Sequence, residues 1–241
     1  MEILIAFLIG IIFGSFYNVV SLRTLSGESL SYPPSHCVNC NHKLSFLDLF
    51  PVFSWLFLRG KCRYCKQPIS PVYPFIELLT GASYALLVFQ FGLTMETLIQ
   101  VAFITIMIVS TATDIKERIV PDRFIVIGII LVLGLRIIDG EMLFHYIISG
   151  IIAFTILFLI LILSKGRMGG ADVKLYALIG LSIGWMDSIG SLFYASMIAL
   201  IYYGSIALKN KGKLDGKQEI PFVPFITLGV LCTYFLPFFR F

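Results

Sequence analysis

Long apolar runs separated by short polar loops extend along almost the whole chain. A helix that crosses a bilayer needs roughly 20 mostly apolar residues, and most of these runs are close to that length. The sixth is shorter, and its boundary with the seventh is not sharp. The pattern predicts an all-α polytopic membrane protein with about eight transmembrane helices. The runs cover residues 3–21, 72–91, 97–113, 124–138, 143–163, 173–185, 188–208 and 221–239.

One long polar stretch, residues 22–71, interrupts this pattern after the first run. The first run has no basic region before it and no small-residue cleavage site after it, so we interpret it as a retained helix and not as a signal peptide. We therefore expect three parts. These are a first transmembrane helix at 1–21, an extramembrane domain at 22–71 and a membrane domain at 72–241.

Composition and charge support this interpretation and give it an orientation. With 58% hydrophobic and only 13% charged residues, 241 residues cannot form a soluble domain. If the runs alternate across the membrane, the loops at 22–71, 114–123, 164–174 and 209–220 share one side. They contain every Lys and Arg except Arg136 and Arg240. The positive-inside rule makes that side cytoplasmic. A plasma (inner) membrane protein is predicted, with the lipid bilayer and no nucleic acid as partner.

Residues 22–71 contain two CxxC pairs, Cys37 with Cys40 and Cys62 with Cys65. Four thiolates complete a closed tetrahedral zinc site, and a domain of about 50 residues is too small to be stable on its core alone. A small cytoplasmic four-cysteine zinc domain is therefore predicted after the first helix. Two disulfides are the alternative, which a reducing cytoplasm disfavours. His36 and His42 flank the first pair and could compete as ligands, but with four cysteines available they are expected beside the ligands or at the surface. Cys232 stands apart as a small core residue.

Two acidic residues lie at the edges of apolar runs, where carboxylates are costly. Asp114 follows the third run directly, and Asp172 precedes the sixth, after Gly169 and Gly170. Two runs separate them, so both lie on the cytoplasmic side. A close pair of carboxylates shares a proton and activates water, as in aspartic proteases. Alternatively, Asp114 is a loop acid and Asp172 a helix cap. Asp122 is predicted to cap the fourth run.

Several motifs in order resemble those of the bacterial prepilin peptidases, membrane aspartic proteases that process type IV pilins and the pseudopilins of competence and type II secretion. The resemblance implies that Asp114 and Asp172 are catalytic. Asp172 ends the family's GxGD signature, in which Ala171 replaces a glycine. The matching segments are residues 14–19, the two CxxC pairs with residues 58–61, Tyr73-Pro74, Glu77-Leu78, Thr80-Gly81, residues 114–122 and residues 169–174.

The resemblance also implies a reaction. Family members remove a short basic leader from a prepilin or pseudopilin, typically after a glycine, on the cytoplasmic side. Members with the cysteine domain commonly methylate the new N-terminal residue with S-adenosylmethionine. No Rossmann-type glycine-rich loop marks a methyl-donor site, and Glu77 is the candidate for it.

Four alternatives remain at the level of the sequence. The first is a peptidase without methyl transfer, and the second is an ion-coupled transporter, which would need acids at the bilayer midplane. The third is a non-enzymatic assembly factor. The fourth is a presenilin-type protease, a group that lacks the cysteine pairs.

Overall fold

The computed structural model describes residues 1–165, 168–209 and 220–236, and it is built almost entirely from helices. Apart from two isolated bridges, these residues contain no β-structure. Each of the eight apolar runs coincides with one helix in the described part of the chain, which confirms the predicted all-α fold. The elements are α1 (Glu2–Ser26), η1 (Phe46–Asp48), α2 (Phe53–Phe57), α3 (Val72–Phe91), α4 (Met95–Glu117), α5 (Asp122–Asp139), α6 (Leu143–Leu163), α7 (Gly170–Ile183), α8 (Trp185–Lys209) and α9 (Val223–Phe235).

Five of these helices, α1, α3, α4, α6 and α8, are long and apolar enough to cross a membrane. Helices α7 and α9 have 14 and 13 residues, which at 1.5 Å per residue gives about 20 Å against a hydrocarbon core of about 30 Å. Helix α5 carries charged residues at both ends. The multi-pass character is thus confirmed, whereas the number of about eight spans is not. The sixth run also ends earlier than predicted, because Gly184 turns the chain with φ +86°. The predicted end of the eighth run, at 239, lies outside the described residues.

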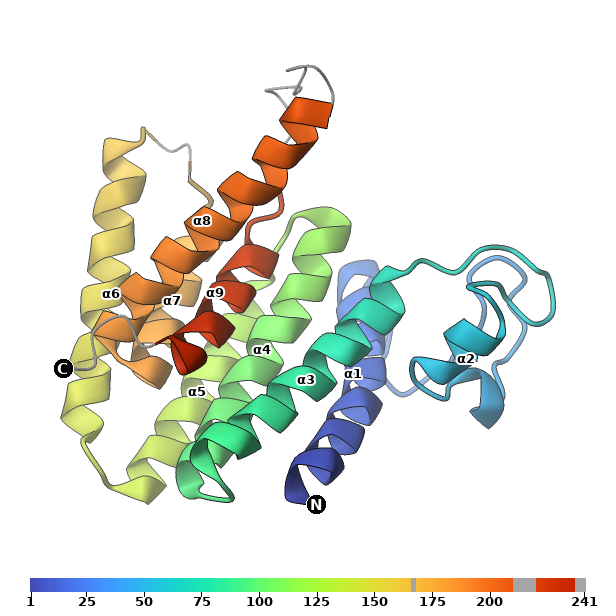
Figure 1. The fold of residues 1–241 in the computed structure, drawn as a ribbon, viewed down its shortest axis with the longest axis horizontal. Helices are drawn as coiled ribbons and strands as arrows, with labels where there is room; N and C mark the ends of the chain where they lie inside the picture. Colours follow the sequence, from blue (N-terminus) through green and yellow to red (C-terminus); the bar gives the residue numbers. More distant parts are fainter. Residues whose placement is uncertain (166–167, 210–219, 237–241) are drawn as a thin grey trace. The chain divides into compact units, whose positions relative to one another are not determined.

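The chain divides into two compact units, and the first comprises Met1–Leu93. In it, α1 and α3 pack along each other and carry the small domain between them (Figure 1). Glycines allow this close approach, because a Cβ on Gly10 would lie 2.7 Å from the Cα of Gly81. Such small-residue contacts are typical of helix packing in membranes. The hydroxyls of Tyr17 and Tyr84 form a buried hydrogen bond of 2.8 Å between the same helices.

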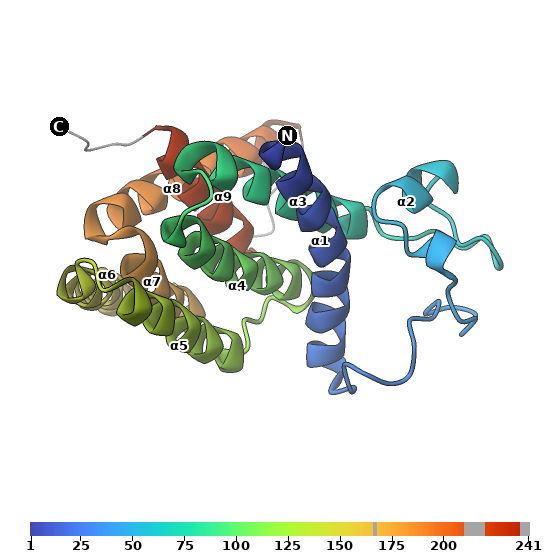
Figure 2. The same cartoon turned by 90° about the horizontal axis from the view of Figure 1, so that it is seen from below.

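The second unit, Thr94–Phe241, is a bundle around α4 and α7. Helix α4 packs against α5, α7 and α9, while α7 packs against α5, α6 and α8 as well (Figure 2). Small residues set the α6–α7 distance, since a Cβ on Gly180 would lie 2.5 Å from the carbonyl oxygen of Ser149. The two central helices therefore expose little side-chain surface.

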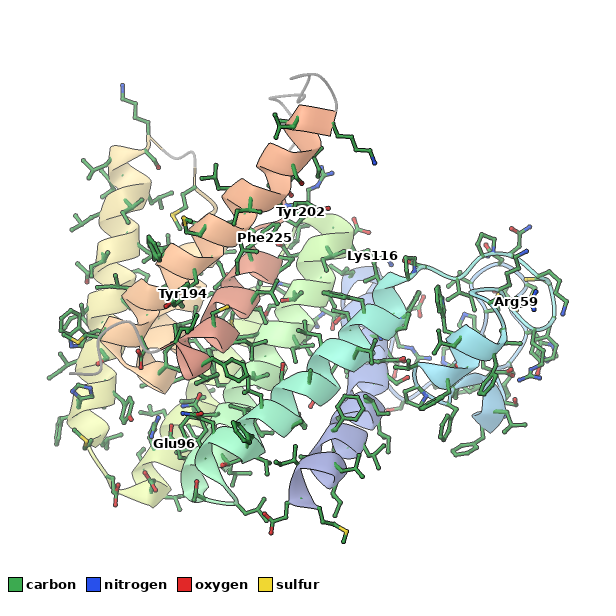
Figure 3. All side chains as sticks on the ribbon, viewed as in Figure 1. Arg59, Glu96, Lys116, Tyr194, Tyr202 and Phe225 are labelled. Atoms are coloured by element: carbon green, nitrogen blue, oxygen red, sulfur yellow. The ribbon has the colours of Figure 1, made fainter. Side chains whose placement is uncertain are left out.

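A polar cluster ties several helices together at the end of this unit that contains Glu96. Figure 3 shows Glu96 and Lys116 at opposite ends of α4. The buried guanidinium of Arg136 donates to both carboxylate oxygens of Glu96, at 2.6 and 3.0 Å, and to the carbonyl of Ser182, at 2.7 Å. Gln100 donates to the same carbonyl and accepts from the hydroxyl of Tyr234 at 2.7 Å. We call these five residues the Arg136 cluster; they join α4, α5, α7 and α9.

Candidate functional site

Asp114 lies in the last turn of α4, and its side chain faces the start of α9. The residue is 7% exposed, and one carboxylate oxygen, Oδ2, accepts the backbone N–H of Val223 at 3.0 Å. Val223 is the first residue of α9, and the first N–H groups of a helix lack partners within the helix. A helix N-terminus also attracts negative charge. The N–H of Val223 and the N-terminus of α9 thus both favour a negative charge on the buried Asp114 carboxylate.

Asp172 is the third residue of α7 and is 8% exposed. The N-cap of α7 is Gly169, so the alternative that Asp172 serves as the cap is wrong. Its carboxylate folds back over Gly169, because a Cβ at position 169 would lie 3.0 Å from Oδ2. A Cβ on Gly170 would meet no atom within 4 Å. A side chain at position 169 would therefore crowd the Asp172 carboxylate, whereas the space beside Gly170 is open.

Asp114 and Asp172 lie on two helices that are in contact. Helices α4 and α7 pack against each other, and the carboxylate of Asp114 is close enough to act electrostatically on that of Asp172. Tyr203 lies within electrostatic range of Asp114, and Tyr176 within range of Asp172. Two buried carboxylates in mutual reach can hold one proton between them. This is the arrangement that acid–base chemistry on a polar bond requires.

The prediction that Asp122 caps the fourth run is wrong. The N-cap of α5 is Pro121, and Asp122 is the first helical residue. Its carboxylate accepts two hydrogen bonds from Nζ of Lys174, at 2.7 and 2.8 Å. This exposed ion pair connects α5 to α7 two residues beyond Asp172. Proline already supplies the extended backbone that a cap position needs, so the carboxylate is left to bind a cation.

Sequence reasoning missed two further features near Asp114. One is the N–H of Val223, for which the only indication was the pair of prolines around the start of the last run. The other is Ser110, one helical turn before Asp114 on the same side of α4. Its hydroxyl is fully buried and has no hydrogen-bond partner within the described part of the chain. A serine in an apolar run gives no indication of its depth, so only the fold could identify it.

The four cysteines of the small domain form one cluster, with all four sulfur atoms within 4.8 Å of one another. The sulfurs of Cys37 and Cys65 are 3.9 Å apart, and none of the four forms a disulfide. Sulfurs bound at about 2.3 Å around a tetrahedral zinc are separated by about 3.8 Å. The cluster therefore fits a structural zinc, as predicted.

Two similar backbone turns hold these cysteines. In the first, the N–H of Asn41 donates to the carbonyl of Cys37 at 2.8 Å, and in the second Lys66 donates to Cys62 at 3.0 Å. Asn41 and Lys66 both have positive φ, 54° and 61°, so each pair ends in the same left-handed turn. The two pairs present their sulfurs from equivalent loops, which is the construction of a zinc knuckle.

Neither nearby histidine enters the cluster. Nδ1 of His36 lies 3.1 Å from the carbonyl of Pro34, and the ring of His42 packs on Tyr64 with 3.6 Å between centroids. Cys232 lies in α9 and is partly exposed. The thiolates of the two pairs are the only ligand set of this kind among the residues that the structure describes.

Asp48 links η1 to the second cysteine pair. Nε of Arg63 donates to its carboxylate at 2.6 Å, and the hydroxyl of Tyr64 donates at 3.1 Å. Burial raises the pKa of Asp48, but the hydrogen bonds from Arg63 and Ser45 outweigh burial and hold this pKa well below its usual range. The carboxylate is therefore charged at neutral pH and fixes η1 beside the cysteine cluster.

Known proteins match this chain along most of its length. Residues 8–91 match the bacterial peptidase A24 N-terminal domain, and residues 101–204 match the type IV leader peptidase family. A prepilin leader peptidase/N-methyltransferase of Bacillus subtilis (strain 168) is 32% identical over 231 residues, covering 95% of this chain and 92% of that protein. Its counterpart in Myxococcus xanthus is 30% identical, and the match covers 88% of this chain and 65% of that protein.

A third relative is the type 4 prepilin-like proteins leader peptide-processing enzyme of Escherichia coli O78:H11. It is 31% identical over 258 residues, covering 94% of this chain and 91% of that protein. No solved structure is significantly similar to this chain.

Proposed function

This chain belongs to the prepilin leader peptidase/N-methyltransferase family, and on that premise we propose that it is a membrane aspartic endopeptidase with Asp114 and Asp172 as its catalytic pair. One observation carries the proposal. Two buried carboxylates, on the two central helices of one unit, lie within electrostatic reach of each other. Burial makes a doubly charged pair costly, so the pair holds one proton at the start of the reaction.

The hydrogen bonds suggest which aspartate does what. The N–H of Val223 stabilises negative charge on Asp114, so Asp114 acts as the base that takes a proton from the attacking water. Asp172 holds the shared proton and donates it to the oxygen of the scissile carbonyl. The water oxygen forms the new C–O bond. The C–N bond then breaks as Asp114 passes the proton it took from water to the leaving nitrogen, and the former carbonyl oxygen returns its proton to Asp172. Products are a carboxylic acid and a free α-amino group.

The substrate proposed from the relatives' names is a prepilin or pseudopilin. The basic loops make the face with both aspartates cytoplasmic; four of their basic residues, Arg167, Lys211, Lys213 and Lys217, lie outside the described residues. A basic leader that ends in glycine would be cut there, in the plasma (inner) membrane, just before the apolar helix of the pilin. Glycine before the scissile bond leaves room for both carboxylates to approach.

We assign N-methylation of the new terminus to the same chain, with S-adenosylmethionine as donor. Methylation must follow cleavage, because the α-amino group does not exist earlier. Zinc held by the four cysteines would keep the small domain folded. The expected order is cleavage first at the two aspartates and methyl transfer afterwards beside the zinc domain.

Substitution of each aspartate tests the peptidase. Asp114→Asn and Asp172→Asn are expected to abolish conversion of precursor to mature pilin on gels, with immunoblots showing unchanged enzyme in the membrane. The matched control is Asp122→Asn, which removes an exposed ion pair worth at most about 1 kcal/mol and should leave most cleavage. Normal cleavage by either of the first two variants would refute the assignment.

Mass spectrometry of the mature N-terminus tests methyl transfer separately. Asp172→Asn should still methylate a pre-cut pilin peptide supplied with S-adenosylmethionine. Replacement of a zinc-binding cysteine should impair methylation at least as much as cleavage. A product of the unmodified enzyme that is cleaved and never methylated would mean that the chain is a peptidase only.

A further inference from the structure

The small domain exposes an unusual amount of apolar surface in one short segment. Residues 46–57, which contain η1 and α2, carry six large apolar side chains that are each at least 45% exposed. Phe46 is 79% exposed and Phe57 is 83% exposed. Exposed apolar clusters of this kind mark interaction sites, because water disfavours them. The six are Phe46, Leu47, Phe50, Phe53, Leu56 and Phe57, and we call them the η1–α2 face.

Hydrogen bonding fixes the depth of this face along α3. The N–H of Val52 donates to the Glu77 carboxylate at 2.7 Å, in a buried contact. Glu77 lies five residues into α3, or about 7 to 8 Å along its axis, and α3 is one of the candidate membrane spans. Helix α2 begins at the next residue, Phe53. If the headgroup boundary lies at the start of α3, this contact brings the segment to the depth at which interfacial helices insert, roughly 5–10 Å into the boundary between headgroups and acyl chains.

Other contacts help to fix the position of this segment relative to α3. Val52 has φ +62°, which is costly for a β-branched residue, and Glu77 captures the N–H that this conformation presents. The indole N–H of Trp55 donates to the carbonyl of Ile69 at 3.1 Å, which connects α2 to the segment that enters α3. Asn18 of α1 donates to the carbonyl of Tyr73 in α3 at 3.1 Å, which joins the two membrane helices beside this point. The hydrogen bond from Val52 to Glu77 thus ties the small domain to a pair of helices that are themselves linked.

The charge of the domain matches a phospholipid surface. Its exposed basic residues are Lys43, Arg59, Lys61, Arg63 and Lys66. Against these stand two acids, Glu28 and Asp48, and Asp48 is paired with Arg63. Phenylalanine and leucine beside exposed lysine and arginine are typical of segments that bind anionic bilayers. A soluble partner protein would also bind apolar groups, but it would have no access at the depth of the second turn of α3.

We propose that the η1–α2 face is a monotopic membrane anchor, whose six apolar side chains insert into the leaflet next to α1 and α3 while the basic residues remain among the anionic headgroups. The ligand is the phospholipid bilayer itself. Two spanning helices already retain the chain in the membrane, so the anchor serves a different purpose. It holds the four-cysteine domain flat against the leaflet.

Photocrosslinking in the full-length protein tests this anchor. A benzophenone amino acid replaces Phe57, and the protein is reconstituted into vesicles of phosphatidylethanolamine and phosphatidylglycerol. The same replacement of Glu28, an exposed acid of the same domain, is the matched control. Illumination should shift the mass of the position-57 protein by that of one phospholipid and leave the position-28 protein unshifted.

Two measurements keep the outcome decisive. Because Phe57 is mostly exposed, its replacement should not unfold the domain, and zinc content of about one per chain would establish this. Phe46 offers a second position with the same expectation. Absence of lipid adducts at both positions in zinc-loaded protein would overturn the proposal. Crosslinks from these positions to a second protein chain or to added prepilin, in place of lipid, would overturn it too.

Discussion

Replacement of Arg136 by methionine tests how the second unit is held together. The arginine is 1% exposed and carries two hydrogen bonds to Glu96 and one to the carbonyl of Ser182. Its guanidinium also lies 3.5 Å from the ring centroid of Tyr146. Methionine fills a similar volume without any of these donors. The change therefore removes the polar contacts of Arg136 and leaves little cavity.

The expected loss of stability is large because the partner remains. Removing one member of a buried ion pair costs about 3–5 kcal/mol, and we expect the lower end because the side chain of Glu96 is 29% exposed. Lysine would keep the charge but lose one of the two hydrogen bonds to Glu96. This loss should cost about 1.5 kcal/mol, the value of one charge-assisted hydrogen bond. The expected order of stability is Arg136, then lysine, then methionine.

Unfolding of the purified full-length protein in mixed micelles, followed by circular dichroism during SDS titration, measures these differences. In a thermal scan, about 3 kcal/mol corresponds to a fall in Tm of roughly 6–12 °C for a chain of this size. The control is Arg123→Met, on the same helix but exposed, which should change stability by less than about 0.5 kcal/mol.

The double variant Glu96→Met with Arg136→Met distinguishes a buried pair from simple packing. If an unpaired charge causes the loss, the double variant should be less destabilised than the sum of the two single variants. Additive losses, or wild-type stability of Arg136→Met, would refute the argument.

Three further results are expected. Metal analysis should find about one zinc per chain, and chelation should unfold the small domain while it frees four thiols; a metal-free domain with unchanged structure would contradict this. Gly180→Ala should cost about 1–3 kcal/mol by overpacking against Ser149, whereas Gly134→Ala, whose Cβ meets nothing within 4 Å, should stabilise α5 by roughly 0.5–1 kcal/mol. Equal effects of the two alanines in the same SDS titration would show that close packing does not set the α6–α7 distance. Lys174→Ala should cost less than about 1 kcal/mol in that titration, since its ion pair with Asp122 is exposed; a larger loss would show that the pair is structural.

The parts of the fold that depend on runs of residues were predictable from the sequence. Apolar runs locate helices, because a backbone in lipid must satisfy its hydrogen bonds internally, and the CxxC pairs are diagnostic for the four-sulfur cluster. Asp114 and Asp172 stood out because carboxylates at membrane edges are costly. All of these are local properties of composition and spacing.

The features that escaped prediction depend on which side chains meet across helices. The sequence places Arg136 in an apolar run without indicating its partner, and Glu96 lies at the start of another run. Asp122 was misjudged because a carboxylate after proline fits both a cap and an ion pair. The number of spans is not confirmed for a different reason: helices packed among neighbours, such as α7, need not be long enough to cross the bilayer.

The position of the two aspartates follows from how such a bundle is stabilised. Between membrane helices the hydrophobic effect contributes little, so close packing and polar contacts hold the bundle together. In this unit Gly180 of α7 packs closely against α6, and the Arg136 cluster joins α4 and α7 to their neighbours. The same two helices carry Asp114 and Asp172 at their other ends. Under the proposed function, the two carboxylates that must stay close and desolvated thus lie on the central helices of the bundle. Mobile outer helices would instead let water separate the pair.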